Sequence, residues 1–168
     1  MSQREKDFNG GIKRGCTAYD IKSKKLDKLL KHCRDNISID GFRMVKQFSN
    51  KMKCNLLGDD CFGFAPDGGA WFKGDKLVAV FEGKKQGVTG NANERWFKNA
   101  VVAKHINPDV FYVTFCSGEG SQTGECLEKM ERLAKITMGD NFMYYRKPSG
   151  FTVKEAKKIM IDTIRRCI

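Results

Sequence analysis

The chain has 168 residues, of which 40% are apolar and 30% charged, so it is long enough for one hydrophobic core and too apolar for a disordered chain. Its 31 Lys and Arg against 20 Asp and Glu give a net charge of +11, which favours a polyanionic partner, nucleic acid before an anionic membrane. No stretch approaches the roughly 18 apolar residues of a spanning helix, and the polar start of the chain lacks a signal-peptide core, which predicts a cytoplasmic location.

The N-terminal part of the chain is predicted to form an arm followed by two helices. Residues 1–23 show no apolar period and are expected to be a flexible basic arm or an irregular lead-in, within a single domain spanning 1–168. Leucines and a cysteine at helical spacing predict an amphipathic helix over 24–35. Asp40 is expected to cap a second helix over about 41–53. The core face of that helix would be formed by Phe42, Val45 and Phe48.

Short apolar runs separated by glycines predict strands in the next segment. Residues 61–64 form a short apolar run, and Gly68-Gly69 marks a turn. Residues 70–72 and 77–81 flank the sequence Lys-Gly-Asp-Lys at 73–76, which is typical of a hairpin turn.

Helices alternate with strands in the second half of the chain. Helices are predicted over 91–106 and 122–136, and a last one is capped by Thr152 and runs to about 166. Residues 110–115 form a near-continuous apolar run, as expected for a strand buried on both faces, and 142–145 form a short strand. A hairpin group followed by this alternation predicts an α/β fold with a mixed central β-sheet and helices on both faces.

The cysteines give no sign of a disulfide framework or of a structural zinc site. Their number is odd, and no two of them form a CxxC pair. We therefore interpret them as reduced thiols that pack as small hydrophobic side chains. They are Cys16, Cys33, Cys54, Cys61, Cys116, Cys126 and Cys167.

Two carboxylates and a lysine are predicted to meet at one end of the sheet. Asp67 lies in a Pro-Asp-Gly-Gly turn, and Glu82 ends the most hydrophobic strand of the hairpin, close enough to converge because neighbouring strands are about 4.8 Å apart. Lys84 follows Glu82 by two residues and therefore points to the same face. Asp67, Glu82 and the Gly83 carbonyl offer the oxygen ligands that Mg²⁺ prefers, and Lys84 is placed to orient a water for phosphodiester hydrolysis. The alternative is a common turn beside an exposed ion pair.

A polar stripe is predicted on the helix that follows. Asn91, Glu94, Arg95 and Lys98 are spaced i, i+3, i+4, i+7 and so share one face. Asn and Arg pair bidentately with adenine and guanine in the major groove, and a carboxylate accepts from an exocyclic amine. The alternative is a solvated helix face. The opposite side, toward the core, would be formed by Ala92, Trp96, Ala100 and Ala103.

The ordered set PDGG…VFEGKKQG…GNANERWFKN resembles the EcoRI-type branch of the PD-(D/E)XK restriction endonucleases. The resemblance covers about residues 64–116 and implies a restriction-endonuclease-like fold, with Asp67 and Glu82 as Mg²⁺ ligands and Lys84 as the catalytic lysine. It also implies readout of an AATT-type core. Asn93 stands where that branch has an apolar residue, so an added base contact or a changed core is expected there. The residues expected to contact DNA are Lys85, Gln86, Gly87, Asn91, Asn93, Glu94, Arg95 and Lys98.

The leading hypothesis is thus a Mg²⁺-dependent type II restriction endonuclease that cleaves double-stranded DNA at an AATT-containing palindrome, leaving 5′-phosphate and 3′-hydroxyl ends. A palindromic site favours a homodimer. Two alternatives stay open: a structure-specific junction or repair nuclease of the same superfamily, and a basic DNA-binding module without catalysis.

Overall fold

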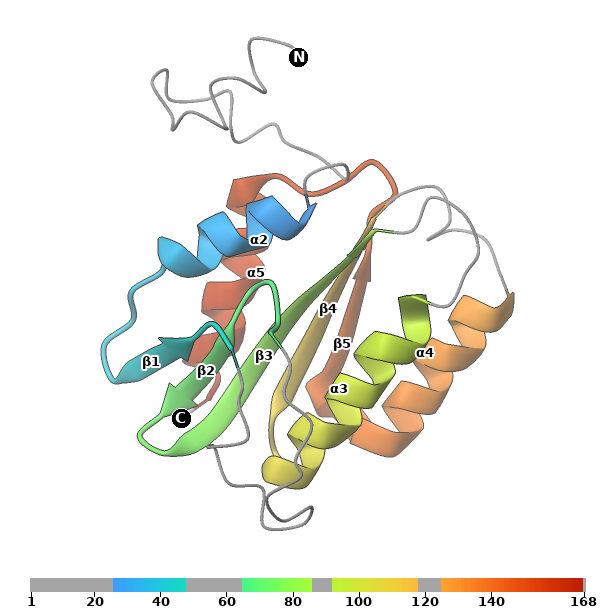
Figure 1. Ribbon diagram of the computed structural model, residues 1–168, viewed down its shortest axis with the longest axis horizontal. Helices are drawn as coiled ribbons and strands as arrows, with labels where there is room; N and C mark the ends of the chain where they lie inside the picture. Colours follow the sequence, from blue (N-terminus) through green and yellow to red (C-terminus); the bar gives the residue numbers. More distant parts are fainter. Residues whose placement is uncertain (1–25, 48–64, 86–91, 118–124, 168) are drawn as a thin grey trace, which may run out of the picture.

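The computed structural model describes residues 26–47, 65–85, 92–117 and 125–167 (Figure 1). Within these ranges the chain forms five strands, four α-helices and one 3-10 turn. None of these helices combines the length and the apolar character needed to cross a bilayer. In chain order the elements are α2 (Leu26–Asp35), β1 (Phe42–Val45), β2 (Ala70–Lys73), β3 (Lys76–Lys85), α3 (Ala92–Ile106), β4 (Phe111–Ser117), α4 (Glu125–Met138), η4 (Gly139–Asn141), β5 (Phe142–Arg146) and α5 (Val153–Arg165).

The five strands form one mixed sheet in the order β1-β2-β3-β4-β5. The pairs β1–β2 and β2–β3 are antiparallel, whereas β3–β4 and β4–β5 are parallel. Each parallel step is bridged by a helix, as parallel neighbours require. The predicted mixed α/β sheet is therefore confirmed.

The predicted hairpin between β2 and β3 is also confirmed. Lys73 pairs with Lys76, which leaves Gly74 and Asp75 as the turn. Gly74 has a φ of +62°, a conformation that glycine adopts without steric cost. β3 extends beyond its partner, since its last pairing with β2 is at Val80. After Val80, the edge of β3 that faced β2 is therefore free to bond with another segment of the chain.

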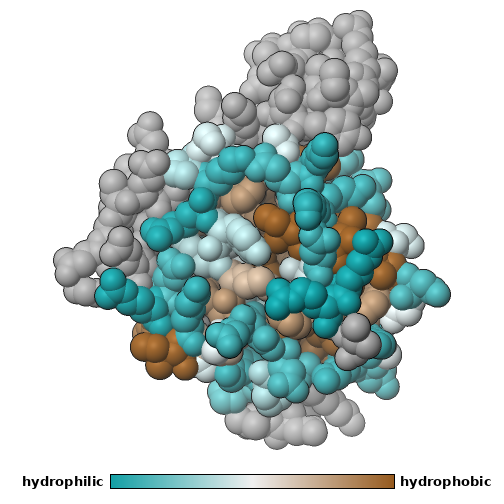
Figure 2. Space-filling view, turned by 180° about the vertical axis from the view of Figure 1, so that it is seen from behind, coloured by the Kyte–Doolittle hydropathy of each residue, from teal (hydrophilic) through white to brown (hydrophobic). Residues whose placement is uncertain are grey.

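The sheet is covered on both faces by helices, as predicted (Figure 1). On one face α2 and α5 enclose a core that includes Leu29, Leu30 and Phe81. On the other, α3 and α4 pack together over a core that includes Val80 and Tyr112. Figure 2 shows one side of the molecule, where hydrophilic side chains predominate and apolar ones form separate patches. All four apolar positions predicted for the first helix, namely Leu26, Leu29, Leu30 and Cys33, are buried.

The predicted cap of the last helix is present. Thr152 accepts a hydrogen bond from the Glu155 backbone N–H, and the Glu155 side chain accepts one from the Thr152 N–H, which together form a capping box. Lys147 forms an ion pair with Glu155. The pKa of Glu155 is lowered, first by the Lys147 hydrogen bond and then by those from Thr152.

The prediction of a helix over 41–53 is wrong. Residues 42–45 form strand β1, in which Phe42 pairs with Lys73 and Val45 with Ala70. Cross-strand contacts support this arrangement, because the Arg43 guanidinium lies 4.8 Å from the centroid of the Phe72 ring. Pairing with the hairpin therefore overrides the local helical pattern. Asp40 is consequently not a helix cap, and Phe48 lies outside the described residues.

Several other predictions fall outside the described residues, including the arm 1–23 and the strand 61–64. Cys16, Cys54 and Cys61 lie there too, and the side chain of Cys126 is not described. Among the described cysteines, Cys33, Cys116 and Cys167 are free and buried, as expected for packed thiols. Burial raises the pKa of Cys33 to about 12, so its thiol stays protonated at neutral pH.

Candidate active site

The turn that carries Asp67 is hydrogen-bonded to the edge of β3 that β2 leaves unpaired. The Gly69 N–H donates to the Pro66 carbonyl over 3.0 Å, which closes the turn. The Gly68 N–H donates to the Phe81 carbonyl over 2.9 Å, and the Phe81 N–H donates to the Gly69 carbonyl over 3.2 Å. These two bonds fix the turn beside β3 at the residue before Glu82.

The two glycines of the turn are required by the geometry. A Cβ atom on Gly68 would lie 2.5 Å from the Cβ of Phe81, so no side chain fits between the turn and the strand. Gly69 has a φ of +83°, in the left-handed region. The Trp71 indole N–H donates to the Gly68 carbonyl over 3.1 Å and anchors the turn to the buried end of β2.

Glu82 and Lys84 project from the end of β3. They are two residues apart and share the face of the sheet that α3 covers. Lys84 Nζ lies 3.6 Å from Glu82 Oε1, and the side chains are 19% and 7% exposed. The strand therefore presents one carboxylate and one ammonium from a largely buried position.

Asp67 approaches β3 from its unpaired edge, on the side where α2 supplies Leu26 and Leu30. Its Oδ2 lies 3.3 Å from where a Cβ on Gly83 would be, so the carboxylate lies against the strand residue between Glu82 and Lys84. Burial, followed by the charge of Glu82, raises the pKa of Asp67, while Lys31 and Lys84 act in the opposite direction. Asp67 thus lies beside Gly83 on the α2 side of β3, whereas Glu82 and Lys84 point to the α3 side. The meeting of all three side chains at one point stays a prediction.

Glu82 has two further partners that the sequence analysis did not identify. The Tyr112 hydroxyl donates to Glu82 Oε2 over 2.8 Å, and the Asn99 side-chain amide donates to the same oxygen over 3.4 Å. Burial and the adjacent Glu82 charge raise the pKa of Tyr112 well above its ordinary value, so the phenol remains a donor. One signal was available, because a tyrosine in a buried strand needs a polar partner for its hydroxyl.

The chemistry of this cluster fits a divalent oxygen-seeking cation. Asp67 is partly buried and Glu82 is buried, and after desolvation the charge of Glu82 contributes to the raised pKa of Asp67, so a bound cation would relieve that repulsion. The described residues contain no group of three or more His, Cys, Asp and Glu side chains suited to a metal. Carboxylate oxygens such as those of Asp67 and Glu82 are ligands that Mg²⁺ prefers.

Of the predicted DNA-reading stripe, the structure describes Lys98 and the backbone of 93–95. The backbone of 93–95 belongs to the first turns of α3, but these side chains are not described. Lys98 is exposed, whereas Ala100 and Ala103 are buried, in agreement with the predicted division of the helix. Outside the described residues lie Gln86, Gly87 and Asn91, and the side chain of Lys85, the last residue of β3, is not described either.

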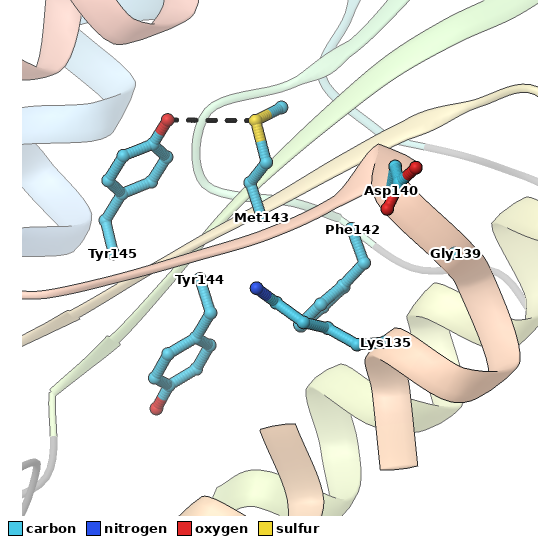
Figure 3. A pocket seen from close by; sticks show the side chains of 7 residues that line it. All are labelled: Lys135, Gly139, Asp140, Phe142, Met143, Tyr144 and Tyr145. Carbon is cyan, nitrogen blue, oxygen red and sulfur yellow. Dashed lines mark hydrogen bonds between the residues drawn. The ribbon is translucent and has the colours of Figure 1, made fainter. Parts of the chain in front are cut away.

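A separate cavity of about 310 Å³ lies along β5 (Figure 3). Lys135 and Asp140 line it together with aromatic residues of β5, and the Tyr145 hydroxyl lies 3.7 Å from Met143 Sδ. The paired carboxylates are not part of its lining. Its side chains offer no pair of acidic groups for metal chemistry, so the candidate site remains at the end of β3. Its full lining is Lys135, Gly139, Asp140, Phe142, Met143, Tyr144 and Tyr145.

No protein-family model, curated protein or solved structure matches this chain.

Proposed function

We propose that this protein is a Mg²⁺-dependent, sequence-specific endonuclease that hydrolyses double-stranded DNA. The observations that carry the proposal are the 3.6 Å contact of Lys84 Nζ with Glu82 Oε1 and the position of Asp67 beside Gly83, the strand residue between them. The order of elements supports it, because an antiparallel hairpin continues into parallel strands bridged by helices, an arrangement compatible with a restriction-endonuclease-like fold. The resemblance of the PDGG, E-x-K and GNA-x-ER segments to the EcoRI-type branch supplies the expected class of target.

The residues at the site divide the work of hydrolysis among them. Asp67 and Glu82, with the Gly83 carbonyl, would hold Mg²⁺, which when bound polarises a phosphoryl oxygen and makes a bound water more acidic. The Lys84 ammonium, 3.6 Å from Glu82 Oε1, orients the attacking water and offsets negative charge on the phosphate. The turn that carries Asp67 is held to β3 by two backbone hydrogen bonds, which fix its position beside the end of the strand.

The proposed partner is duplex DNA with an AATT-containing palindrome, bound by a homodimer in which each subunit cuts one strand. The net charge of +11 supports a polyanionic partner. The products would be a 5′-phosphate and a 3′-hydroxyl, and such an enzyme would belong to a restriction–modification system.

The direct test is to incubate the purified full chain with a plasmid of known sequence and Mg²⁺, and then to sequence every new end. We expect discrete ends at AATT sites and no cutting in the presence of EDTA. Random ends, or no ends, would contradict the proposal. A preference for branched over linear duplexes would instead favour the junction or repair nuclease.

A pair of lysine variants separates catalysis from binding. Lys84→Met keeps the apolar stem and removes the ammonium, so we expect cleavage to fall by about 100-fold or more while DNA binding in Ca²⁺ persists. Lys135→Met removes an exposed ammonium from the cavity along β5 and serves as the matched control. If both variants cut like the wild type, Lys84 has no catalytic role. If DNA binding and cutting are both unchanged when Lys84 or Asp67 is replaced, a non-catalytic DNA-binding module is favoured.

A further inference from the structure

The two carboxylate oxygens of Glu82 lie in different surroundings. Oε2 accepts hydrogen bonds from the Tyr112 hydroxyl at 2.8 Å and from the Asn99 amide at 3.4 Å. Oε1 lies on the side of Lys84, 3.6 Å from its Nζ. Both donors come from residues that are at most 9% exposed. One oxygen is therefore held by the protein interior, and the other is directed to the side where Lys84 lies.

We propose that Tyr112 and Asn99 are positioning residues that fix the Glu82 carboxylate with Oε1 presented to the catalytic metal, and that Asn99 links this carboxylate to the helix that reads DNA. The inference rests on the proposed nuclease function and extends it to two residues outside the three-residue motif. Neither residue is expected to contact the metal, the DNA or the attacking water, so each acts through Glu82.

Tyr112 is well suited to hold the carboxylate still. It is fully buried on β4, in the strand that pairs in parallel with β3. Its ring stacks on that of Phe142, with centroids 6.5 Å apart and planes inclined by 14°. A ring packed in this way has one orientation available, so its hydroxyl defines where Glu82 Oε2 lies.

Asn99 provides a connection from α3 to the same oxygen. Ala100 and Ala103 are fully buried, so α3 lies close against the sheet and Asn99 reaches Glu82 directly. The helix begins at Ala92, and Asn99 is one turn, or about 6 Å, beyond Arg95. Any displacement of α3 when its first turns engage bases is therefore transmitted to Glu82, which couples target recognition to the arrangement of the metal ligands.

Binding of Mn²⁺ to the full chain, measured by calorimetry without DNA, tests the positioning role independently of cleavage. Tyr112→Phe removes only the hydroxyl, and we expect about a tenfold weaker Mn²⁺ affinity, because losing a residue that orients a metal ligand typically costs 10–100-fold. Tyr145→Phe removes a hydroxyl that bonds to Met143 rather than to Glu82, so it should bind Mn²⁺ like the wild type. Equal affinity in the wild type and Tyr112→Phe would overturn the positioning role, as would a wild type that binds no Mn²⁺.

The kinetics of the variants distinguish positioning from general damage to the fold. With DNA as the varied substrate, we expect Tyr112→Phe to lower kcat and raise the Mg²⁺ requirement while KM for DNA stays unchanged. A purely structural role would lower the melting temperature and leave the Mg²⁺ requirement unchanged, which would contradict the proposal. If the wild type binds Mn²⁺ in a Tyr112-dependent manner but cuts no DNA, the nuclease function fails and the positioning role stands.

Asn99→Ala tests the link to α3 and also covers the case in which Tyr112→Phe does not fold. We expect a smaller loss of Mn²⁺ affinity than for Tyr112→Phe, because the Asn99 contact with Glu82 is the longer of the two. We also expect lower specificity, measured as the rate of cutting at AATT divided by the rate at sites with one altered base. Asn141→Ala is the matched control, because the Asn141 amide bonds to the Asp109 carbonyl. An unchanged cutting ratio in Asn99→Ala would overturn the coupling.

Discussion

Replacing Gly68 by alanine should damage both the fold and the candidate site, because this residue forms the closest contact between the Asp67 turn and β3. An added Cβ would lie 2.5 Å from the Cβ of Phe81 and 3.1 Å from the Phe81 carbonyl oxygen. Two carbon atoms in ordinary contact are about 3.5 Å apart, so the turn would have to move by about 1 Å. Neither obstacle is the flexible end of a side chain, so the turn itself must yield.

The size of the effect follows from the bonds that this shift breaks. The hydrogen bonds from the Gly68 N–H to Phe81 and from the Phe81 N–H to Gly69 measure 2.9 and 3.2 Å, and neither survives a displacement of that size. Each contributes about 1 kcal/mol, so we expect a loss of about 2 kcal/mol in the free energy of unfolding. For a domain of this length that lowers the melting temperature by about 4–8 °C. Moving Asp67 by about 1 Å should also reduce cleavage by about 100-fold.

The assay compares thermal melting and single-turnover cleavage in Gly68→Ala and in Gly139→Ala. Gly139 has a φ of +72° with nothing within 4 Å of an added Cβ, so its replacement costs about 1–2 kcal/mol in backbone strain without crowding any neighbour. We expect both variants to melt at lower temperature but only Gly68→Ala to lose cleavage. A Gly68→Ala protein that melts and cuts like the wild type would refute the reasoning, as would equal losses of cleavage in the two variants.

Three further predictions test separate parts of the structure. Asp67→Asn should stabilise the metal-free protein at neutral pH, because the raised pKa of Asp67 means that its ionised form is disfavoured in the folded state. That gain should begin to shrink as the pH falls through the raised folded pKa and should vanish only below the unfolded pKa of about 3.9, where the carboxyl is neutral in both states. Denaturant unfolding at several pH values measures it, and a gain that persists in strong acid would contradict the cause. Thr152→Ala should lower the free energy of unfolding by about 1 kcal/mol through loss of the α5 cap, and an unchanged urea midpoint would exclude that contribution. Cys33 should resist alkylation in the native protein because its thiol is buried and its pKa is about 12, and rapid modification detected by mass mapping would disprove its burial.

Local patterns in the sequence were sufficient to predict much of the fold. The helical spacing of leucines in α2 and the hairpin before β3 are signals contained within a few residues, and the structure confirms both. Asp67 lies beside the strand residue between Glu82 and Lys84 because the glycine turn hydrogen-bonds to the end of β3. That the three side chains act at one point stays a prediction.

Features that depend on distant partners were not predictable in this way. Residues 42–45 have the apolar spacing of a helix, and they form β1 only because β2 offers an unpaired edge. The contacts of Tyr112 and Asn99 with Glu82 span 30 and 17 residues of chain, so neither was identified. The register of β4 against β3 places Tyr112 opposite Val80, two residues before Glu82, and the sequence pattern contains no signal for that register.

The most direct test of the account is single-turnover cleavage of a short duplex with one central AATT palindrome, beside a duplex with the same bases scrambled. With Mg²⁺ we predict cutting of both strands of the first duplex only, at symmetric positions, with a 5′-phosphate on each downstream fragment. An intact AATT duplex, or equal cutting of the scrambled one, would contradict the proposal that Asp67, Glu82 and Lys84 form the catalytic centre of a sequence-specific nuclease.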